Sequence, residues 1–318
     1  MTSQQISRIE LVELRDLEVL NCSNNNIKEL KLPWDRGSGY DWIYTSLKIL
    51  DCSGNEIKNL DLSRNTLLET LDCSKNIIEN INLPKDYDPA GPPFYLARLN
   101  NLNCSNNLLS TISFLNNYSI KIIDCSFNNC ASLEFASPFN DSYGGRYLQS
   151  ISYLDCSNNQ LAELNVADPK ITELDCSNNL ISNFSSYGRI RTTLNIANNQ
   201  LKNLNLKINE YGFGNTSIVS NLDTRGNSEL YCVTVENKQY ADNNPNYQKG
   251  DVTGFKEYSC YSSSLYLSSN KESIKNDGWV VGTGLGFYDE KSYIPLFSNE
   301  RISPSKKLMF TFDIGYKF

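Results

Sequence analysis

Cysteine is the residue type in this sequence that could do the most chemistry, because a thiolate can act as a nucleophile or bind a metal ion. The chain has 318 residues with ten cysteines and no histidine. Without histidine it lacks the commonest general base and the commonest metal ligand, which argues against catalysis. Seven of the cysteines recur at intervals of 20 to 31 residues: Cys22, Cys52, Cys73, Cys104, Cys125, Cys156 and Cys176.

The context of these seven cysteines favours a structural role. Metal sites need ligands that converge on one point, usually with local C-x-x-C pairs, whereas each of these cysteines stands alone in a repeated phrase, L-x-x-L-x-C-x-x-N-x-L-x-x-L-x-L. An eighth copy of the phrase has Ile196 at the cysteine position, and a ninth has Thr224. We therefore expect the seven cysteines to be small buried hydrophobic residues, and we expect the same of Cys130, which occupies the position of Ile57.

The repeated phrase predicts the fold. A single copy cannot bury its own apolar residues, so successive copies must stack. The segment around Leu50 alternates between inward and outward positions, as a short parallel strand does, and Asn55 then turns the chain. Leu60 and Leu62 close the opposite side. The sequence predicts a β-dominated solenoid of α/β type, with a parallel concave sheet of about nine strands and a mostly irregular convex side.

The phrase resembles the leucine-rich-repeat family, and its LDCSNN form at 154–159 and 174–179 resembles short-repeat surface proteins of Bacteroidetes-like bacteria. The resemblance covers about residues 9–260. It implies a curved arc that recognises proteins or glycans, and it implies no shared chemistry. We expect repeats over 1–228, a C-terminal cap over 229–260 and a β-rich tail over 261–318. The cap resembles closing caps whose two cysteines pair, which implies a Cys232–Cys260 disulfide and an oxidising compartment.

A column of acidic and amide residues follows each inward leucine, and two interpretations of it stay open. Aspartates one strand apart repel by about 1 kcal/mol even at the dielectric constant of water, which suggests an acidic stripe that attracts cations or a basic partner. Alternatively, each aspartate bonds a neighbouring serine on a solvated face. The candidate ligand-binding members are Asp51, Asp72, Asp124, Asp155 and Asp175.

Four insertions, at 33–46, 84–98, 136–150 and 207–218, interrupt the repeats and are rich in aromatic residues. Long loops are commonly kept for function, and aromatic side chains are enriched in binding hot spots. All four are expected to leave the same edge of the arc, where they either contact a ligand or pack on one another. The candidate ligand-binding residues are Trp34, Tyr40, Trp42, Tyr44, Tyr87, Phe94, Tyr95, Phe139, Tyr143 and Tyr147.

The two ends of the sequence depart from the repeat. Ile9 and Leu11 fit the convex side of a preceding repeat, so we expect a fragment that starts within a repeat and lacks an N-terminal cap and export signal. Strand-like stretches occur at 279–288 and 308–318, and the second, with its strict period of two, resembles the final strand of an outer-membrane β-barrel. The 58 residues after Cys260 are too few to close a barrel alone.

The composition of the chain excludes some classes of function. A net charge of −7 and a pI near 4.9 argue against nucleic-acid binding. No run of about 18 apolar residues predicts a transmembrane helix. We expect a non-enzymatic protein-binding or glycan-binding module without cofactor or metal. It would be exported or on the cell surface, and would mediate adhesion or recognition through the concave face and the aromatic loops. The alternative is a structural spacer that associates with the outer membrane through its C-terminal tail.

Overall fold

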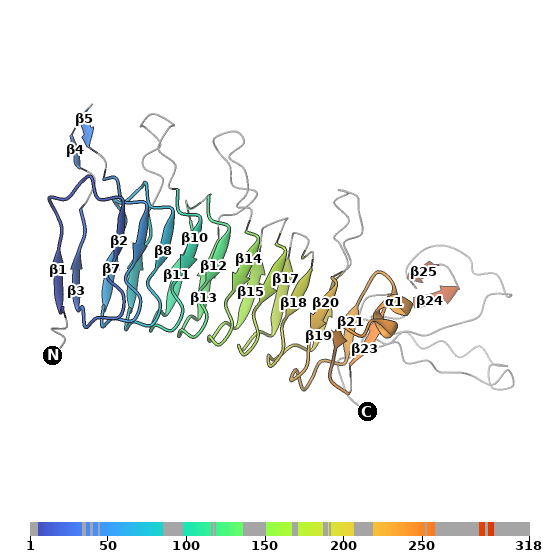
Figure 1. Cartoon of the computed structure of the whole chain (residues 1–318). Helices are drawn as coiled ribbons and strands as arrows, with labels where there is room; N and C mark the ends of the chain where they lie inside the picture. Colours follow the sequence, from blue (N-terminus) through green and yellow to red (C-terminus); the bar gives the residue numbers. More distant parts are fainter. Residues whose placement is uncertain are drawn as a thin grey trace, which may run out of the picture. The chain divides into compact units, whose positions relative to one another are not determined.

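The computed structural model describes residues 6–33, 36–38, 41–43, 45–84, 98–115, 117, 119–135, 151–166, 171–186, 190, 192–206, 219–251, 253–257, 286–289 and 292–295. The chain divides into two compact units, Met1–Glu257 and Tyr258–Phe318. The first unit is a solenoid in which one repeat stacks on the next (Figure 1).

One face of the solenoid is a parallel sheet of ten strands. Each of the first nine consists of three residues with an inward leucine or isoleucine at its centre, and these central residues are in register, as Leu50 with Leu71 shows. Nine strands were expected, and the tenth comes from the cap. The strands are β2 (Val19–Asn21), β6 (Ile49–Asp51), β8 (Thr70–Asp72), β10 (Asn101–Asn103), β12 (Ile122–Asp124), β14 (Tyr153–Asp155), β16 (Glu173–Asp175), β18 (Thr193–Asn195), β20 (Asn221–Asp223) and β22 (Tyr247–Gln248).

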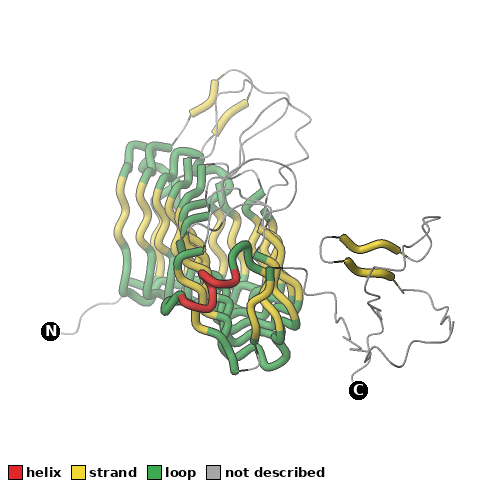
Figure 2. The backbone as a smooth tube through the Cα atoms, turned by 90° about the vertical axis from the view of Figure 1, so that its right-hand side faces the viewer, coloured by secondary structure: helices red, strands yellow, loops and turns green. Residues whose placement is uncertain are grey.

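The opposite face is more regular than the mostly irregular convex side that we expected. It carries short parallel strands, most of which have one leucine or similar residue between two polar ones, and the strands of neighbouring repeats pair (Figure 2). Three of the four breaks between these groups follow the insertions at 33–46, 84–98 and 136–150. The groups are β1 (Arg8–Glu10) with β3 (Glu29–Lys31), β7 (Asn59–Asp61) with β9 (Asn80–Asn82), β11 (Thr111–Ser113) with β13 (Ser132–Glu134), β15 (Glu163–Val166) with β17 (Asn183–Ser186), and β19 (Asn203–Asn205) with β21 (Cys232–Thr234) and β23 (Gly254–Lys256).

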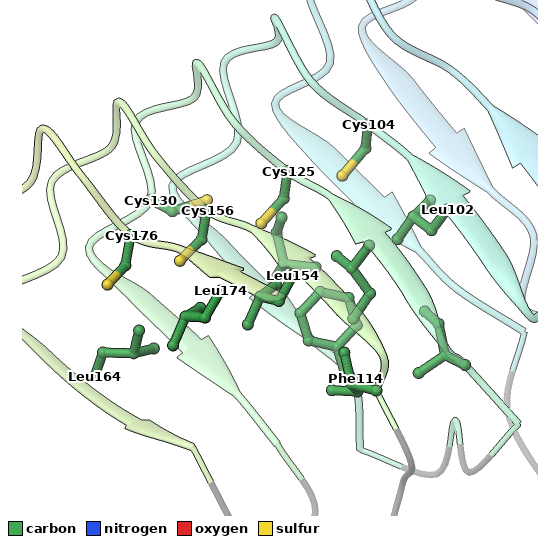
Figure 3. Close-up of a cluster of buried hydrophobic side chains, with 14 of the residues drawn as sticks. Leu102, Cys104, Phe114, Cys125, Cys130, Leu154, Cys156, Leu164, Leu174 and Cys176 are labelled. Carbon is green, nitrogen blue, oxygen red and sulfur yellow. The ribbon is translucent and has the colours of Figure 1, made fainter. Parts of the chain in front are cut away.

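The core lies between the two faces. Leucines of the ten-stranded sheet pack against residues of the opposite face, and the thiols of Cys104, Cys125, Cys156 and Cys176 lie in one row beside them (Figure 3). The expectation that the repeat cysteines and Cys130 are buried is confirmed, and all eight are free thiols. Sulfur fills the volume next to each turn without adding a polar group that needs a strong partner.

An asparagine ladder holds the turns that follow the ten-stranded sheet. The Asn55 Nδ2 donates to the carbonyl oxygens of Cys52 at 2.9 Å and of Cys22, in the preceding repeat, at 3.0 Å. The Asn55 Oδ1 accepts from the backbone N–H of Ile27 at 3.0 Å. Each such side chain therefore satisfies buried backbone groups in two repeats at once. Equivalent residues are Asn76, Asn107, Asn128, Asn159, Asn179, Asn199 and Asn227.

The residue before each ladder asparagine has a left-handed backbone. At this position φ is 63° for Gly54 and between 53° and 56° for seven other residues. Glycine and asparagine adopt this conformation more readily than other residues. Seven of the nine repeats use one of them here, and the exceptions are Lys75 and Phe127.

The C-terminal end of the solenoid is closed by a cap. Its helix α1 (Lys238–Asn243) begins at Asn237, whose side chain accepts from the Tyr240 N–H at 2.8 Å. Strand β22 pairs with β20 and so adds the tenth strand to the sheet. Tyr247 anchors β22, because its hydroxyl donates to the Val219 carbonyl at 2.5 Å and its ring packs against Phe255.

Two short antiparallel pairs lie outside the repeats. Within the first insertion, β4 (Arg36–Ser38) pairs with β5 (Asp41–Ile43). In the second unit, β24 (Gly286–Asp289) pairs with β25 (Ser292–Pro295). Strand β24 overlaps the end of the strand-like stretch expected at 279–288, and the stretch expected at 308–318 lies outside the described residues.

Candidate functional site

The solvent-facing side of the ten-stranded sheet is built from two columns of side chains that flank the inward residue of each strand. The column after it is nearly uniform, since it contains only aspartate and asparagine in the first nine strands. The column before it varies, and variation is what selective recognition needs. In strand order it reads Val19, Ile49, Thr70, Asn101, Ile122, Tyr153, Glu173, Thr193 and Asn221.

The aspartates of the uniform column organise the turns. The Asp72 Oδ1 accepts from both the backbone N–H and the hydroxyl of Ser74, at 2.9 and 2.7 Å. This confirms that the aspartates bond neighbouring serines. The same aspartate–serine contact occurs at Asp51, Asp124, Asp155 and Asp175.

Asparagines relieve the repulsion between the aspartates at several points along this column. The Asn21 Nδ2 donates to Asp51 Oδ2 at 3.1 Å, and the Asn103 Nδ2 donates to Asp72 Oδ2 at 3.3 Å. At the other end of the sheet, the Asn195 Nδ2 donates to Asp175 Oδ2 at 2.8 Å. The three asparagines therefore interrupt the acidic column, and its longest run of aspartates is the group of three in the middle.

Asp124, Asp155 and Asp175 occupy three consecutive strands without an intervening asparagine. The pKa of Asp155, the central member, is raised. Burial is the main cause, Asp175 and Asp124 add to it, and the hydrogen bonds from Ser157 oppose it. The negative charge of this stretch is therefore concentrated and partly desolvated. None of the three aspartates forms a salt bridge within the part of the chain that the structure describes.

Two large hydrophobic side chains lie beside this acidic stretch. Ile122 is 43% exposed and Tyr153 is 36% exposed, and they are direct partners on adjacent strands β12 and β14. Burial, followed by the charges of Asp155 and Asp124, raises the pKa of the Tyr153 hydroxyl, so the phenol stays neutral. We call Ile122, Tyr153, Asp124, Asp155 and Asp175 the central sheet patch.

A polar hollow adjoins the central sheet patch at the edge where the strands begin. It has a volume of about 470 Å³. Asn101 lies in its wall, and the Asn101 Oδ1 is buried without a hydrogen-bond partner among the described residues. Lys121, next to Ile122 in the chain, connects the hollow to the patch. The lining residues are Glu69, Thr70, Arg98, Asn100, Asn101, Ser119 and Lys121.

The buried thiols offer no reactive site. In the described part of the chain, no group of three or more cysteine or acidic side chains could hold a metal ion. Burial raises the pKa of every repeat cysteine, to about 11 for Cys22 and well above the ordinary value for Cys73 and Cys104. Because the thiolate is the nucleophile, these side chains are chemically inert at neutral pH.

Cys22 is expected to be the first of the eight free thiols to react with iodoacetamide. It is 7% exposed, whereas the other seven are 0% exposed, and it lies in β2's repeat at the end of the sheet. Peptide mapping after brief alkylation of the native chain at pH 8 should find the label on Cys22 well before the other seven. Uniform labelling of all eight without denaturant would show that the core opens readily.

The aromatic candidates of the insertions are outside the part that the structure describes, apart from the backbone of Trp42 in β5. The described residues that flank the insertions at 33–46, 84–98 and 136–150 lie where the opposite-face strands end and the next strand of the sheet follows. Cys232 is disulfide-bonded, and its expected partner Cys260 lies outside the described residues. Sequence analysis did not identify Ile122 and Tyr153. A large apolar residue at an outward position of a strand is the sequence feature that could have identified them.

Among the described residues, no helix is long and apolar enough to cross a bilayer. No protein-family model and no curated protein matches the chain. The chain is similar to the functional domain of InlJ from Listeria monocytogenes, whose description includes a cysteine ladder. The two share 22% identity with a TM-score of 0.48, and the match covers 80% of this chain and 53% of that one.

Two further similar structures are of YopM, a leucine-rich effector protein. The match to YopM from Yersinia enterocolitica WA-314 has 22% identity and a TM-score of 0.46, and it covers 79% of this chain and 47% of that one. The match to YopM from Yersinia pestis has 20% identity and a TM-score of 0.49, with coverage of 79% and 64%. The chain thus spans less than two thirds of each. Its own stacked strands and asparagine ladder identify the fold as a leucine-rich-repeat solenoid.

Proposed function

We propose that this chain is a non-enzymatic protein-binding module whose ten-stranded sheet binds a partner segment with basic and apolar side chains. The central sheet patch carries the proposal. Exposed Ile122 and Tyr153 offer apolar contact area beside Asp124, Asp155 and Asp175. Tyrosine is enriched in binding hot spots, and complementary charge increases the association rate and excludes acidic partners.

The rigidity of the sheet supports this role. Strands β12 and β14 are held in register on both sides, and the turn of each is fixed by an aspartate and a ladder asparagine. Side chains on such a surface lose little backbone entropy on binding. The partner would contact a surface that is already in its binding conformation.

The aromatic insertions would add a second contact region at the edge where the strands begin. Trp34, Tyr40, Trp42, Tyr44, Tyr87, Phe94, Tyr95, Phe139, Tyr143 and Tyr147 are the candidate residues. The polar hollow adjoins the second insertion, because Arg98 closes that insertion and lines the hollow. In a variant of this proposal, the aromatic side chains of the insertions bind a glycan instead of a protein.

We place the module at the cell surface or outside the cell, in a role in adhesion or recognition. The disulfide at Cys232 supports an oxidising location, where such bonds persist. A Cys232–Cys260 pair would link the two ends of the expected cap at 229–260. Mass spectrometry of the unreduced chain after proteolysis would identify the partner of Cys232 directly.

The proposed binding mode is tested with an array of immobilised random-sequence peptides probed with the full chain. We expect the bound peptides to be enriched in lysine or arginine together with an apolar residue. We expect the affinity for a selected peptide to fall as salt increases, because exposed charge pairs are screened. The Ile122→Thr/Tyr153→Thr double variant should bind at least about tenfold more weakly, since about 1.4 kcal/mol of lost contact energy has that effect.

The control variants come from the chain itself. Threonine occupies the equivalent outward position at Thr70 and Thr193, so both substitutions suit the sheet. A Trp34→Ala/Trp42→Ala/Tyr95→Ala variant tests the insertions separately. Bound peptides without a preference for basic residues, or equal binding by the Ile122/Tyr153 variant and the unmodified chain, would rule out the central sheet patch as the binding site.

The alternative function is a spacer that associates with the outer membrane through residues 261–318. The period-two pattern that ends at Phe318 motivates it. Detergent-dependent extraction of the full chain from membranes, lost when residues 279–318 are removed, would favour it over a soluble binding role.

A further inference from the structure

The turns that carry the asparagine ladder form one long edge of the solenoid, which we call the asparagine edge. It is the lower edge in Figure 1, opposite the edge from which the insertions leave. The turns of the first three and last two repeats carry charged residues along it. There Lys28 pairs with Glu56 at 3.4 Å, Lys58 with Glu79 at 3.1 Å, and Lys202 with Glu229 at 3.0 Å.

The middle of the asparagine edge has a different composition. Four consecutive turns, at 105–110, 126–131, 157–162 and 177–182, contain no charged residue, although one residue in five of the whole chain is charged. Three large apolar side chains are exposed there. Leu108 is 44% exposed, Phe127 is 54% exposed and Leu180 is 47% exposed. We call these four turns the neutral edge.

Phe127 occupies the least suitable backbone position of its turn. Its φ is 53°, in the left-handed region, where bulky residues are outliers. The stack imposes this conformation. The Phe127 N–H donates to the Ser157 carbonyl at 3.0 Å, and the Asn107 N–H donates to the Phe127 carbonyl at 3.2 Å. Five other repeats have asparagine at this position, so the phenylalanine adds strain and an exposed ring without helping the turn. Such strain points to a function for the side chain.

We propose that the neutral edge is a self-association surface through which two copies of this chain form a symmetric dimer. The whole chain carries a net charge of −7, so two copies repel each other over most of their surfaces. The neutral edge lets two copies meet without burying like charges. A single surface that meets itself is the arrangement that a two-fold dimer requires.

The positions of the three apolar residues fit a two-fold axis between the fifth and sixth repeats. Such an axis places the turn of Leu108, in the fourth repeat, opposite the turn of Leu180, in the seventh repeat of the other copy. Both leucines directly follow a ladder asparagine, so they occupy the same place in their turns. The two Phe127 rings then flank the axis, about one strand spacing of 4.8 Å apart. Each exposed side chain gains an uncharged or apolar neighbour.

Four turns form a small interface, below the roughly 800 Å² per partner of a standard complex. The dimer is therefore weak and depends on concentration. Sedimentation velocity of the full chain from low micromolar to sub-millimolar concentration should show the sedimentation coefficient rising from the monomer value toward the dimer value. A monomer throughout this range would overturn the proposal.

Variants taken from neighbouring repeats locate the interface. Phe127→Asn introduces the residue found at this position in five other repeats, and Leu180→Gln introduces the residue found at Gln160 and Gln200. Each should weaken the dimer at least about tenfold. Phe127→Asn should not lower the thermal midpoint of the monomer, because asparagine fits the left-handed turn better. Loss of dimer without loss of stability is the result that supports the proposal.

Ile122→Thr is the matched control. It removes an exposed apolar side chain from the sheet face and leaves the asparagine edge unchanged. The dimer should persist in this variant. Dimerisation that survives Phe127→Asn combined with Leu180→Gln, or that is lost in Ile122→Thr, would assign self-association to another surface. This test is independent of peptide binding at the central sheet patch.

Discussion

Raising the pH above about 9 is expected to unfold the solenoid over a narrow interval. The ordinary pKa of the cysteine thiol is 9.0, and burial raises it to about 11 for Cys22, to about 12 for Cys130 and further for the remaining repeat cysteines. At a pH between 9.0 and the raised pKa, a thiol of the unfolded chain has lost its proton while the same thiol of the folded chain keeps it. The folding stability contributed by each thiol is therefore complete below pH 9 and is lost as the pH rises toward the raised pKa.

The size of this effect comes from the number of thiols. Each thiol lowers the free energy of unfolding by about 1.4 kcal/mol per pH unit in this window. The eight free cysteines together give a slope approaching about 11 kcal/mol per pH unit, which is eight times about 1.4. Since the total stability of a domain is about 5–15 kcal/mol, unfolding within about one to two pH units follows. Denaturant titrations followed by circular dichroism at pH 8 to 10.5 measure the slope.

A variant with alanine at Cys125 and Cys156 provides the control for the alkaline transition. Both side chains are fully buried, and the substitutions create small cavities, so the variant is less stable at pH 8. Its slope above pH 9 should be smaller by about 2.8 kcal/mol per pH unit, because two thiols are missing. Equal slopes for the variant and the unmodified chain would mean that the thiols do not drive the alkaline unfolding.

Asn128→Ala is expected to be strongly destabilising for a substitution of a single polar residue. The Asn128 Nδ2 donates to the carbonyl oxygens of Cys104 and Cys125 at 3.0 and 3.1 Å, and the Oδ1 accepts from the Leu109 N–H at 3.1 Å. Alanine leaves these buried groups without partners, and each such group costs about 1–3 kcal/mol. We expect a loss of about 4 kcal/mol or more, measured by urea denaturation at pH 7.

The adjacent residue supplies the comparison for Asn128. Asn129 is exposed, and its backbone N–H donates to the Leu109 carbonyl, a contact that alanine keeps. Asn129→Ala should change the stability by less than about 0.5 kcal/mol. If the two alanine variants differ by less than about 1 kcal/mol, the ladder hydrogen bonds contribute little to stability beyond what water supplies.

The period of the repeat made most of the fold predictable. The inward place of Leu50, the turn at Asn55 and the burial of the cysteines all follow from one stacked phrase, because every copy meets the same neighbours. The convex strands were not predicted because each is only about three residues long. One leucine between two other residues is too short an alternation of apolar and polar positions to assign a strand. The tenth strand was missed because Tyr247–Gln248 lies in the cap, where no repeated phrase marks it.

The candidate site was less predictable than the fold. Sequence analysis identified the aspartate column because it is uniform, but uniformity reflects a shared structural task, as the bond between Asp72 and Ser74 shows. Ile122, Tyr153 and Phe127 were overlooked because each stands at an outward position whose residue type differs from repeat to repeat. Their importance depends on exposure and on which side chains lie beside them, and these are properties of the stacked repeats rather than of one copy.

The asparagine ladder also gives the solenoid a direction. The Asn55 side chain completes the turn of the preceding repeat by binding the Cys22 carbonyl and the Ile27 N–H, and the same relation holds at Asn128. Because ribosomes release the N-terminal end first, each turn must wait for the next ladder asparagine, 20 to 31 residues later, before its backbone groups are satisfied. During synthesis, the last turn to emerge therefore lacks part of its hydrogen bonds until the next repeat has followed it.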